Sequence, residues 1–161
     1  MIKTIIVTIL IINICACEPI QAVSKPGERQ KPANFTCLTS QSQCEINSIL
    51  GRFTVQLSGA LSQGKIKTDQ PFHIQLQFNA ANDAYHLKNI SSYLEGKTMF
   101  MGKIPVFFER DKSSDNSRIA ESLLVSCSEE IMTWRLWFHL EITGNEGIEQ
   151  QDFFIDFDSQ R

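Results

Sequence analysis

Hydrophobic and polar residues alternate in short runs along most of the chain. Side chains of a strand point in turn to opposite faces of a sheet, so a period of two predicts sheets with one buried face. Many of the eleven phenylalanines lie in these runs, as is typical of strands. We therefore expect an all-β protein. The runs predict strands over residues 53–57, 72–78, 87–94, 99–101, 104–108, 119–125, 132–142 and 153–157.

The last two runs predict a long β-hairpin whose register follows from the sequence. Asn145 and Glu146, between two glycines, are suited to a two-residue loop. Such a loop matches apolar residues on the inner face and pairs opposite charges and two aromatic residues on the outer face. A slip by one residue would turn charges into the core. The predicted pairs are Phe138–Phe153, Leu136–Ile155 and Trp134–Phe157 inside, and His139–Asp152, Trp137–Phe154 and Arg135–Asp156 outside.

These strands predict one domain over residues 37–161. A length of 161 residues allows one domain of ordinary size, and 42% hydrophobic residues with 20% charged ones is a globular composition. Seven or eight short antiparallel strands separated by turn residues favour an immunoglobulin-like β-sandwich. A small β-barrel is the alternative.

The first residues differ in character from this domain. Lys3 precedes an apolar stretch over residues 4–14, which is typical of a secretory signal. The stretch is shorter than the roughly 17–25 residues of a spanning helix. Ile14-Cys15-Ala16-Cys17 then resembles the bacterial lipobox, with Cys15 departing from its usual Ala or Ser. We expect residues 1–16 to be a lipoprotein signal peptide and Cys17 to carry the lipid.

Residues 17–36 are predicted to be the lipidated cysteine and a flexible tether. Pro19, Pro26 and Pro32 lie among polar residues without a hydrophobic period. Glu18 after the lipobox cysteine implies, by the same resemblance, sorting to the outer membrane. We expect an outer-membrane lipoprotein that faces the periplasm and binds the membrane through its lipid. The alternative is cleavage after Ala22, which would release a soluble periplasmic structural accessory protein.

Three cysteines remain for disulfide chemistry in that oxidising compartment. Cys37, Cys44 and Cys127 allow three single pairings. Cys37–Cys44 would close a small loop at the entrance of the domain, and we favour it. Cys44–Cys127 would instead join the first strand to a late one and close a much longer loop.

Composition and motifs exclude several classes of function. A net charge of −3 gives no electrostatic reason for nucleic-acid binding. Neither a Gly-x-Ser-x-Gly nucleophile motif nor a Cys-x-x-Cys or His-Glu-x-x-His zinc motif is present in the sequence. We expect a non-enzymatic protein without a resident cofactor.

Four sulfur residues keep copper open as an alternative. Met99 and Met101 would share one side of a predicted strand, and Cys127 and Met132 follow later. Thiolate and thioether ligands select Cu(I). Methionine is also a common filler of hydrophobic cores, which is the simpler interpretation.

The outward pair Trp137 and Phe154 is the candidate partner-binding site. Two large aromatic residues opposite each other on a polar face need cover, either from the chain's own loops or from another protein. We therefore predict a binding or accessory module of the cell envelope with a protein partner. Copper binding or delivery is the second hypothesis.

Three segments resemble a family of uncharacterised proteobacterial envelope lipoproteins. They are Gly-Lys-Thr-Met-Phe-Met-Gly-Lys-Ile-Pro-Val at 96–106, Leu-Val-Ser-Cys-Ser at 124–128 and Met-Thr-Trp-Arg at 132–135. The resemblance implies that the early cysteine pair and these segments belong to one domain over roughly 37–157. The family brings no established activity. The layout is also similar to small sandwich domains of periplasmic metal-handling proteins, which leaves the copper alternative in place.

Overall fold

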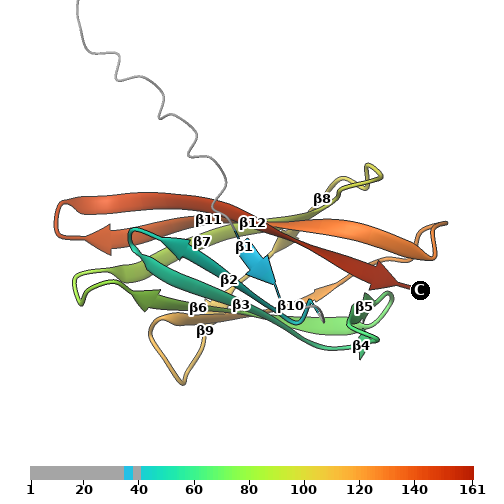
Figure 1. Ribbon diagram of the computed structural model, residues 1–161, viewed down its shortest axis with the longest axis horizontal. Coiled ribbons are helices and arrows are strands. Elements are labelled where there is room, and N and C mark those ends of the chain that lie inside the picture. Colours follow the sequence, from blue (N-terminus) through green and yellow to red (C-terminus); the bar gives the residue numbers. More distant parts are fainter. Residues whose placement is uncertain (1–34, 38–40) are drawn as a thin grey trace, which may run out of the picture.

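The computed structural model describes residues 35–37 and 41–161, which form two β-sheets without any helix in these ranges (Figure 1). The long β11–β12 hairpin, coloured orange to red, spans most of the long axis (Figure 1). The twelve strands in these ranges are β1 (Phe35–Cys37), β2 (Gln43–Ser48), β3 (Gly51–Gly59), β4 (Leu61–Ser62), β5 (Lys65–Lys67), β6 (Pro71–Ala80), β7 (His86–Gly96), β8 (Lys103–Val106), β9 (Glu109–Arg110), β10 (Ser117–Leu123), β11 (Ile131–Gly144) and β12 (Gly147–Gln160).

Each sheet contains six strands. The first has the order β1-β2-β3-β6-β10-β9, and the second has the order β4-β5-β12-β11-β7-β8. Neighbouring strands are antiparallel except β5 and β12, which are parallel. This arrangement confirms the expected all-β sandwich. Eight of these strands have four or more residues, in line with the expected number, and the other four are too short to show an alternating pattern.

The core lies between the two sheets and is formed by the inward residues of the alternating runs. Along β11, for example, every second residue from Met132 to Ile142 is buried. Four phenylalanine rings connect the sheets through the centre of this core. Their centroids are 4.9 Å apart for Phe138 and Phe153, 5.2 Å for Phe153 and Phe53, and 4.7 Å for Phe53 and Phe78. Residues far apart in sequence are thus joined in one aromatic cluster.

The predicted register of the last hairpin is confirmed. β11 and β12 pair over their whole length, with Gly144 opposite Gly147 and a two-residue turn between them. Phe138 faces Phe153 inside the sandwich, while Trp137 faces Phe154 outside. The hairpin therefore fixes the two central strands of the second sheet.

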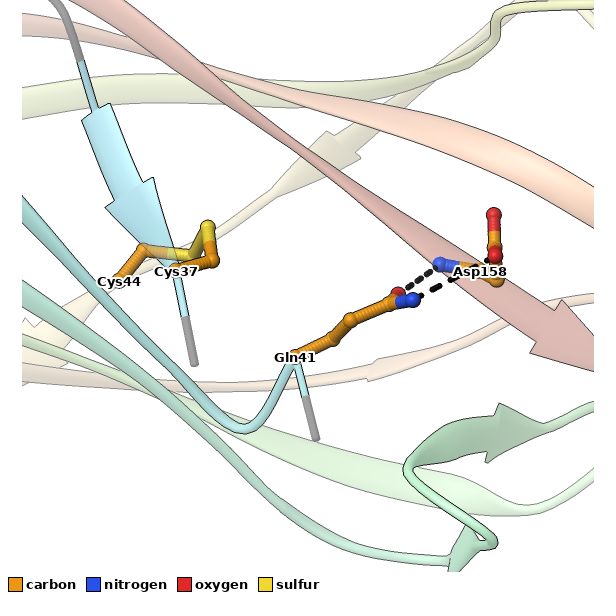
Figure 2. Close-up of a disulfide and its surroundings, with 4 residues drawn as sticks. All are labelled: Cys37, Gln41, Cys44 and Asp158. Carbon is orange, nitrogen blue, oxygen red and sulfur yellow. Dashed lines mark hydrogen bonds between the residues drawn. A yellow bond between two sulfur atoms is a disulfide. The ribbon is translucent and has the colours of Figure 1, made fainter. Parts of the chain in front are cut away.

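The predicted disulfide is also confirmed. Cys37 lies opposite Cys44 in the β1–β2 pair, and their sulfur atoms are bonded (Figure 2). On the chain-entropy account, a disulfide that closes a loop this short stabilises the folded state by about 2.5 kcal/mol. Backbone pairing extends from Cys37 back to Phe35, so β1 begins two residues before Cys37.

Gln41 ties this N-terminal hairpin to the opposite sheet. Its side-chain oxygen accepts a hydrogen bond of 2.6 Å from the backbone N–H of Asp158 in β12 (Figure 2). Its amide nitrogen lies 3.4 Å from the Asp158 carboxylate. The entrance of the domain is therefore attached to both sheets.

One predicted strand is wrong. Residues 99–101 lie in the bend between β7 and β8 and not in a strand. Gly102, with a φ of +75°, turns the chain there, a conformation that glycine adopts without steric cost. The alternation predicted that Met99 and Met101 share one face of a strand, and this prediction is wrong.

The predicted signal peptide, Cys17 and most of the tether lie outside the described residues. Within residues 35–37 and 41–161, no helix is long and apolar enough to cross a membrane.

Candidate functional site

The outer face of the second sheet carries a row of ring-containing side chains across four neighbouring strands. The strand register places Pro105 of β8 opposite Tyr93 of β7, Tyr93 opposite Trp137 of β11, and Trp137 opposite Phe154 of β12. We call Tyr93, Trp137 and Phe154 the aromatic row, and Pro105 lies at its end. The three aromatic residues occupy outward positions, because their strand neighbours Leu94, Phe138 and Phe153 are buried in the core.

The Trp137 ring contacts both other rings of this row. The ring centroids of Tyr93 and Trp137 are 6.3 Å apart with an angle of 27° between the ring planes, and those of Trp137 and Phe154 are 4.9 Å apart with an angle of 56°. Their side chains are half-buried. Cross-strand aromatic pairs of this kind stabilise a sheet while they leave part of each ring in contact with solvent.

A second row of alternating charge runs beside the aromatic row. It consists of Lys103 of β8, Glu95 of β7, Arg135 of β11 and Asp156 of β12, which are opposite one another in register. We call it the charged row. Arg135 binds Asp156 through two hydrogen bonds, of 2.8 Å from Nε and 3.0 Å from Nη2. Such a bidentate pair has a fixed geometry.

The charged row holds the aromatic rings in place. The Trp137 Nε1–H donates a 2.7 Å hydrogen bond to Glu95. The Arg135 guanidinium lies 3.8 Å from the centroid of Phe154, and Lys103 Nζ lies 4.1 Å from that of Tyr93. Each ring is therefore contacted by a charged group from the neighbouring row, in cation–π geometry for the two cations.

Asp156 is the best-connected charge of this face. Burial opposes ionisation of its carboxyl, but hydrogen bonds and positive charge from Arg135 and Lys97 outweigh this effect and lower the pKa of Asp156. The Lys97 ammonium lies 2.8 Å from the carboxylate. The hydrogen bond to Asp156 raises the pKa of Arg135, although burial acts in the opposite direction. Both groups are charged at neutral pH, so Asp156 forms ion pairs with Arg135 and Lys97 on this part of the face.

A shallow polar pocket of about 180 Å³ lies on the other side of the aromatic row. His139, which lies parallel to the Trp137 ring at 6.2 Å, forms the border between them. His139 Nδ1 is 3.0 Å from Asp152 Oδ1. The pocket is lined by Asn89, Ser91, His139, Leu140, Glu141, Gln150 and Asp152.

The sequence predicted part of this face. It placed Trp137 and Phe154 outward and opposite each other, and the structure agrees. It did not predict Tyr93, Glu95 and Lys103, because their positions depend on how β7 and β8 pair with β11. A register shift between Glu141 and Ile142 interrupts the pairing of β7 with β11, and no local pattern in the sequence signals it.

The four sulfur residues named from the sequence are brought together in part. Cys127 is a half-buried free thiol whose Sγ lies 3.6 Å from Sδ of Met132, which is buried. Met101 packs against the same edge of the core, whereas the side chain of Met99 is exposed. In the described part of the chain, no three His, Cys, Asp or Glu side chains lie close enough together to hold a metal ion.

The sequence matches no protein-family model and no curated protein. The fold is similar to part of the crystal structure of a DUF4785 family protein from Legionella pneumophila subsp. pneumophila str. Philadelphia 1, with a TM-score of 0.53 and 11% sequence identity. The similarity covers 67% of this chain and 28% of that chain. At this level of identity the similarity concerns the fold, and it agrees with a β-sandwich architecture.

Proposed function

We propose that this protein is a lipid-anchored, non-enzymatic module of the bacterial cell envelope that binds an envelope protein through the outer face of its second sheet. The aromatic row, flanked by the charged row, is the observation that carries this proposal. The lipobox-like sequence around Cys17 supports the anchor, and the proline-containing segment after it supports a tether.

The composition of this face supports a protein partner. Tryptophan, tyrosine and arginine contribute most often to the residues that dominate binding energy in protein interfaces. Here Tyr93, Trp137 and Arg135 lie side by side, with Phe154 next to them. Their side chains are held by neighbours on the same sheet, so binding would cost little additional side-chain entropy. The polar pocket and the charged row would form the polar rim around this apolar centre.

The anchor is tested by replacing the cysteine that would carry the lipid. We expect Cys17→Ser to move the protein from the membrane fraction to the soluble periplasmic fraction, because the apolar segment before it is too short to span a bilayer. Cell fractionation followed by immunoblotting measures this, with Cys15→Ser as the matched control that stays in the membrane fraction. Retention of Cys17→Ser in membranes would contradict a lipid anchor.

The binding face is tested by photocrosslinking in living cells. A photoreactive phenylalanine analogue replaces Ser91, which is exposed beside the aromatic row, or His73, which is exposed on the outer face of the first sheet. We expect one adduct of defined mass from position 91 and none of that mass from position 73. Equal adducts from both positions, or none from position 91, would contradict the proposed face.

A further inference from the structure

Three sulfur side chains converge at one edge of the core, on the inner side of the second sheet. Met101 comes from the bend between β7 and β8, Cys127 from the segment between β10 and β11, and Met132 from the start of β11. We call these residues the sulfur cluster. The cluster is separate from the aromatic row, which lies on the opposite face of the same sheet.

The spacing of two of these sulfurs suits a shared metal ion. Cys127 Sγ and Met132 Sδ are 3.6 Å apart. With metal–sulfur bonds of about 2.3 Å and bond angles between tetrahedral and trigonal, two ligand sulfurs lie roughly 3.8–4.0 Å from each other. A movement of a few tenths of an ångström would therefore bring both sulfurs to the distances that a bound ion requires.

Gly96 at the end of β7 gives the two methionines the room to meet. A Cβ at this position would collide with the Met132 methyl group and with the backbone carbonyl oxygen of Met99, and it would lie 3.4 Å from Cγ of Met101. Both methionine side chains thus pass over the α-carbon of Gly96. The Met101 side chain therefore lies beside that of Met132, whose sulfur contacts Cys127.

We infer that the sulfur cluster is a Cu(I) site with one thiolate ligand and two thioether ligands. Thiolate and thioether sulfur are the donors that Cu(I) selects, whereas zinc takes Cys, His, Asp and Glu. Two neutral thioethers favour a monovalent soft ion over a divalent one. On binding, the Cys127 thiol releases its proton to solvent and its thiolate donates to copper, which stays in the Cu(I) state throughout. Cys127 and Met101 are half-buried and Met132 is buried, so a copper donor can reach the cluster from the side of Cys127 and Met101.

The test is an anaerobic Cu(I) titration of the full chain, purified from membranes in detergent, in competition with bathocuproine disulfonate. We expect the wild-type chain to bind one Cu(I) more per chain than the Cys127→Ser variant. Cys127→Ser should weaken this binding at least about a hundredfold, since the loss of outer-shell partners alone costs 10–100-fold. Met132→Leu and Met101→Leu, which conserve volume, should each weaken it about tenfold or more. Met99→Leu is the matched control and should leave the affinity within about twofold, because the Met99 side chain is exposed and outside the cluster.

Two results would overturn this inference. One is a wild-type chain that binds no more Cu(I) than Cys127→Ser. The other is a strong loss in Cys127→Ser with unchanged binding in both cluster methionine variants, which would show a thiol that binds copper by itself. Circular dichroism of each variant excludes unfolding as the cause of a loss. None of these outcomes depends on whether a protein partner binds the aromatic row.

Discussion

Phe153→Ala is expected to lower the free energy of unfolding by about 3–5 kcal/mol, far more than a substitution on the outer face of the same strand. The Phe153 ring is fully buried and contacts both Phe138 of the same sheet and Phe53 of the opposite sheet. Its removal would leave a cavity in the aromatic cluster that joins the two sheets. Small domains have a total stability of about 5–15 kcal/mol, so the loss would be a large part of it. Urea denaturation followed by tryptophan fluorescence measures the change.

The neighbouring residue provides a matched control. Phe154→Ala removes the same number of atoms one position further along β12, but from the outer face, where Phe154 is half-buried beside Trp137. We expect a loss of about 1 kcal/mol, as for a cross-strand aromatic pair. If the two substitutions cost the same, the assignment of inner and outer faces would be wrong.

Arg118→Ala is expected to cost about 2–4 kcal/mol. Arg118 of β10 is 5% exposed, and its guanidinium donates to the backbone carbonyl oxygen of Leu87 in the opposite sheet at 2.8 Å. It also donates to the carbonyl oxygens of Asp115 at 2.6 Å and Ser117 at 2.8 Å. Burial lowers the pKa of Arg118, with a smaller contribution from the charge of Arg110. Alanine would leave these carbonyl groups without their donor at the edge of the core.

Arg110→Ala is the control for this substitution. Arg110 lies opposite Arg118 on β9 and is exposed, so we expect a change within about 0.5 kcal/mol. Urea denaturation of both variants compares them directly. If Arg118→Ala lowers the free energy of unfolding by less than about 1 kcal/mol, the prediction is wrong, and water satisfies the carbonyl groups in place of the guanidinium.

The sequence predicted the features that depend on local alternation. Six successive inward residues in β11 and the two-residue turn at Asn145 and Glu146 determined the register of the hairpin, because a shift by one residue would have buried charges. The same argument placed Trp137 and Phe154 on the outer face. The close spacing of Cys37 and Cys44 favoured their pairing, and the structure contains this disulfide.

The features that depend on pairing between distant strands were not predictable in this way. Tyr93 and Lys103 join the aromatic and charged rows only because β7 lies beside β11 and β8 lies beside β7. Met99 and Met101 alternate with Phe100 as in a strand, but Gly102 bends the chain there. Arg118 was not predicted to be buried because its partners are backbone carbonyl groups, which leave no mark in the sequence.

The proposed lipid anchor and the proposed binding face together lead to an expectation of how the protein would work. If residues 17–36 were a random coil, a tether of about twenty residues would reach roughly 25 Å, so the domain would stay close to the membrane surface. A partner in the same membrane would then meet the domain at a high effective concentration. Under these conditions even a modest interface on the aromatic row would be occupied.

The most direct test of the binding face combines the photocrosslinker at Ser91 with Trp137→Ala in the same chain. Trp137 is at the centre of the aromatic row, and loss of a central aromatic residue from an interface costs about 2 kcal/mol or more in binding. We predict that the yield of the adduct falls more than about tenfold, while Leu123→Ala, exposed on the first sheet, leaves it unchanged. An unchanged adduct in a folded Trp137→Ala chain would contradict the proposal that this face binds the partner.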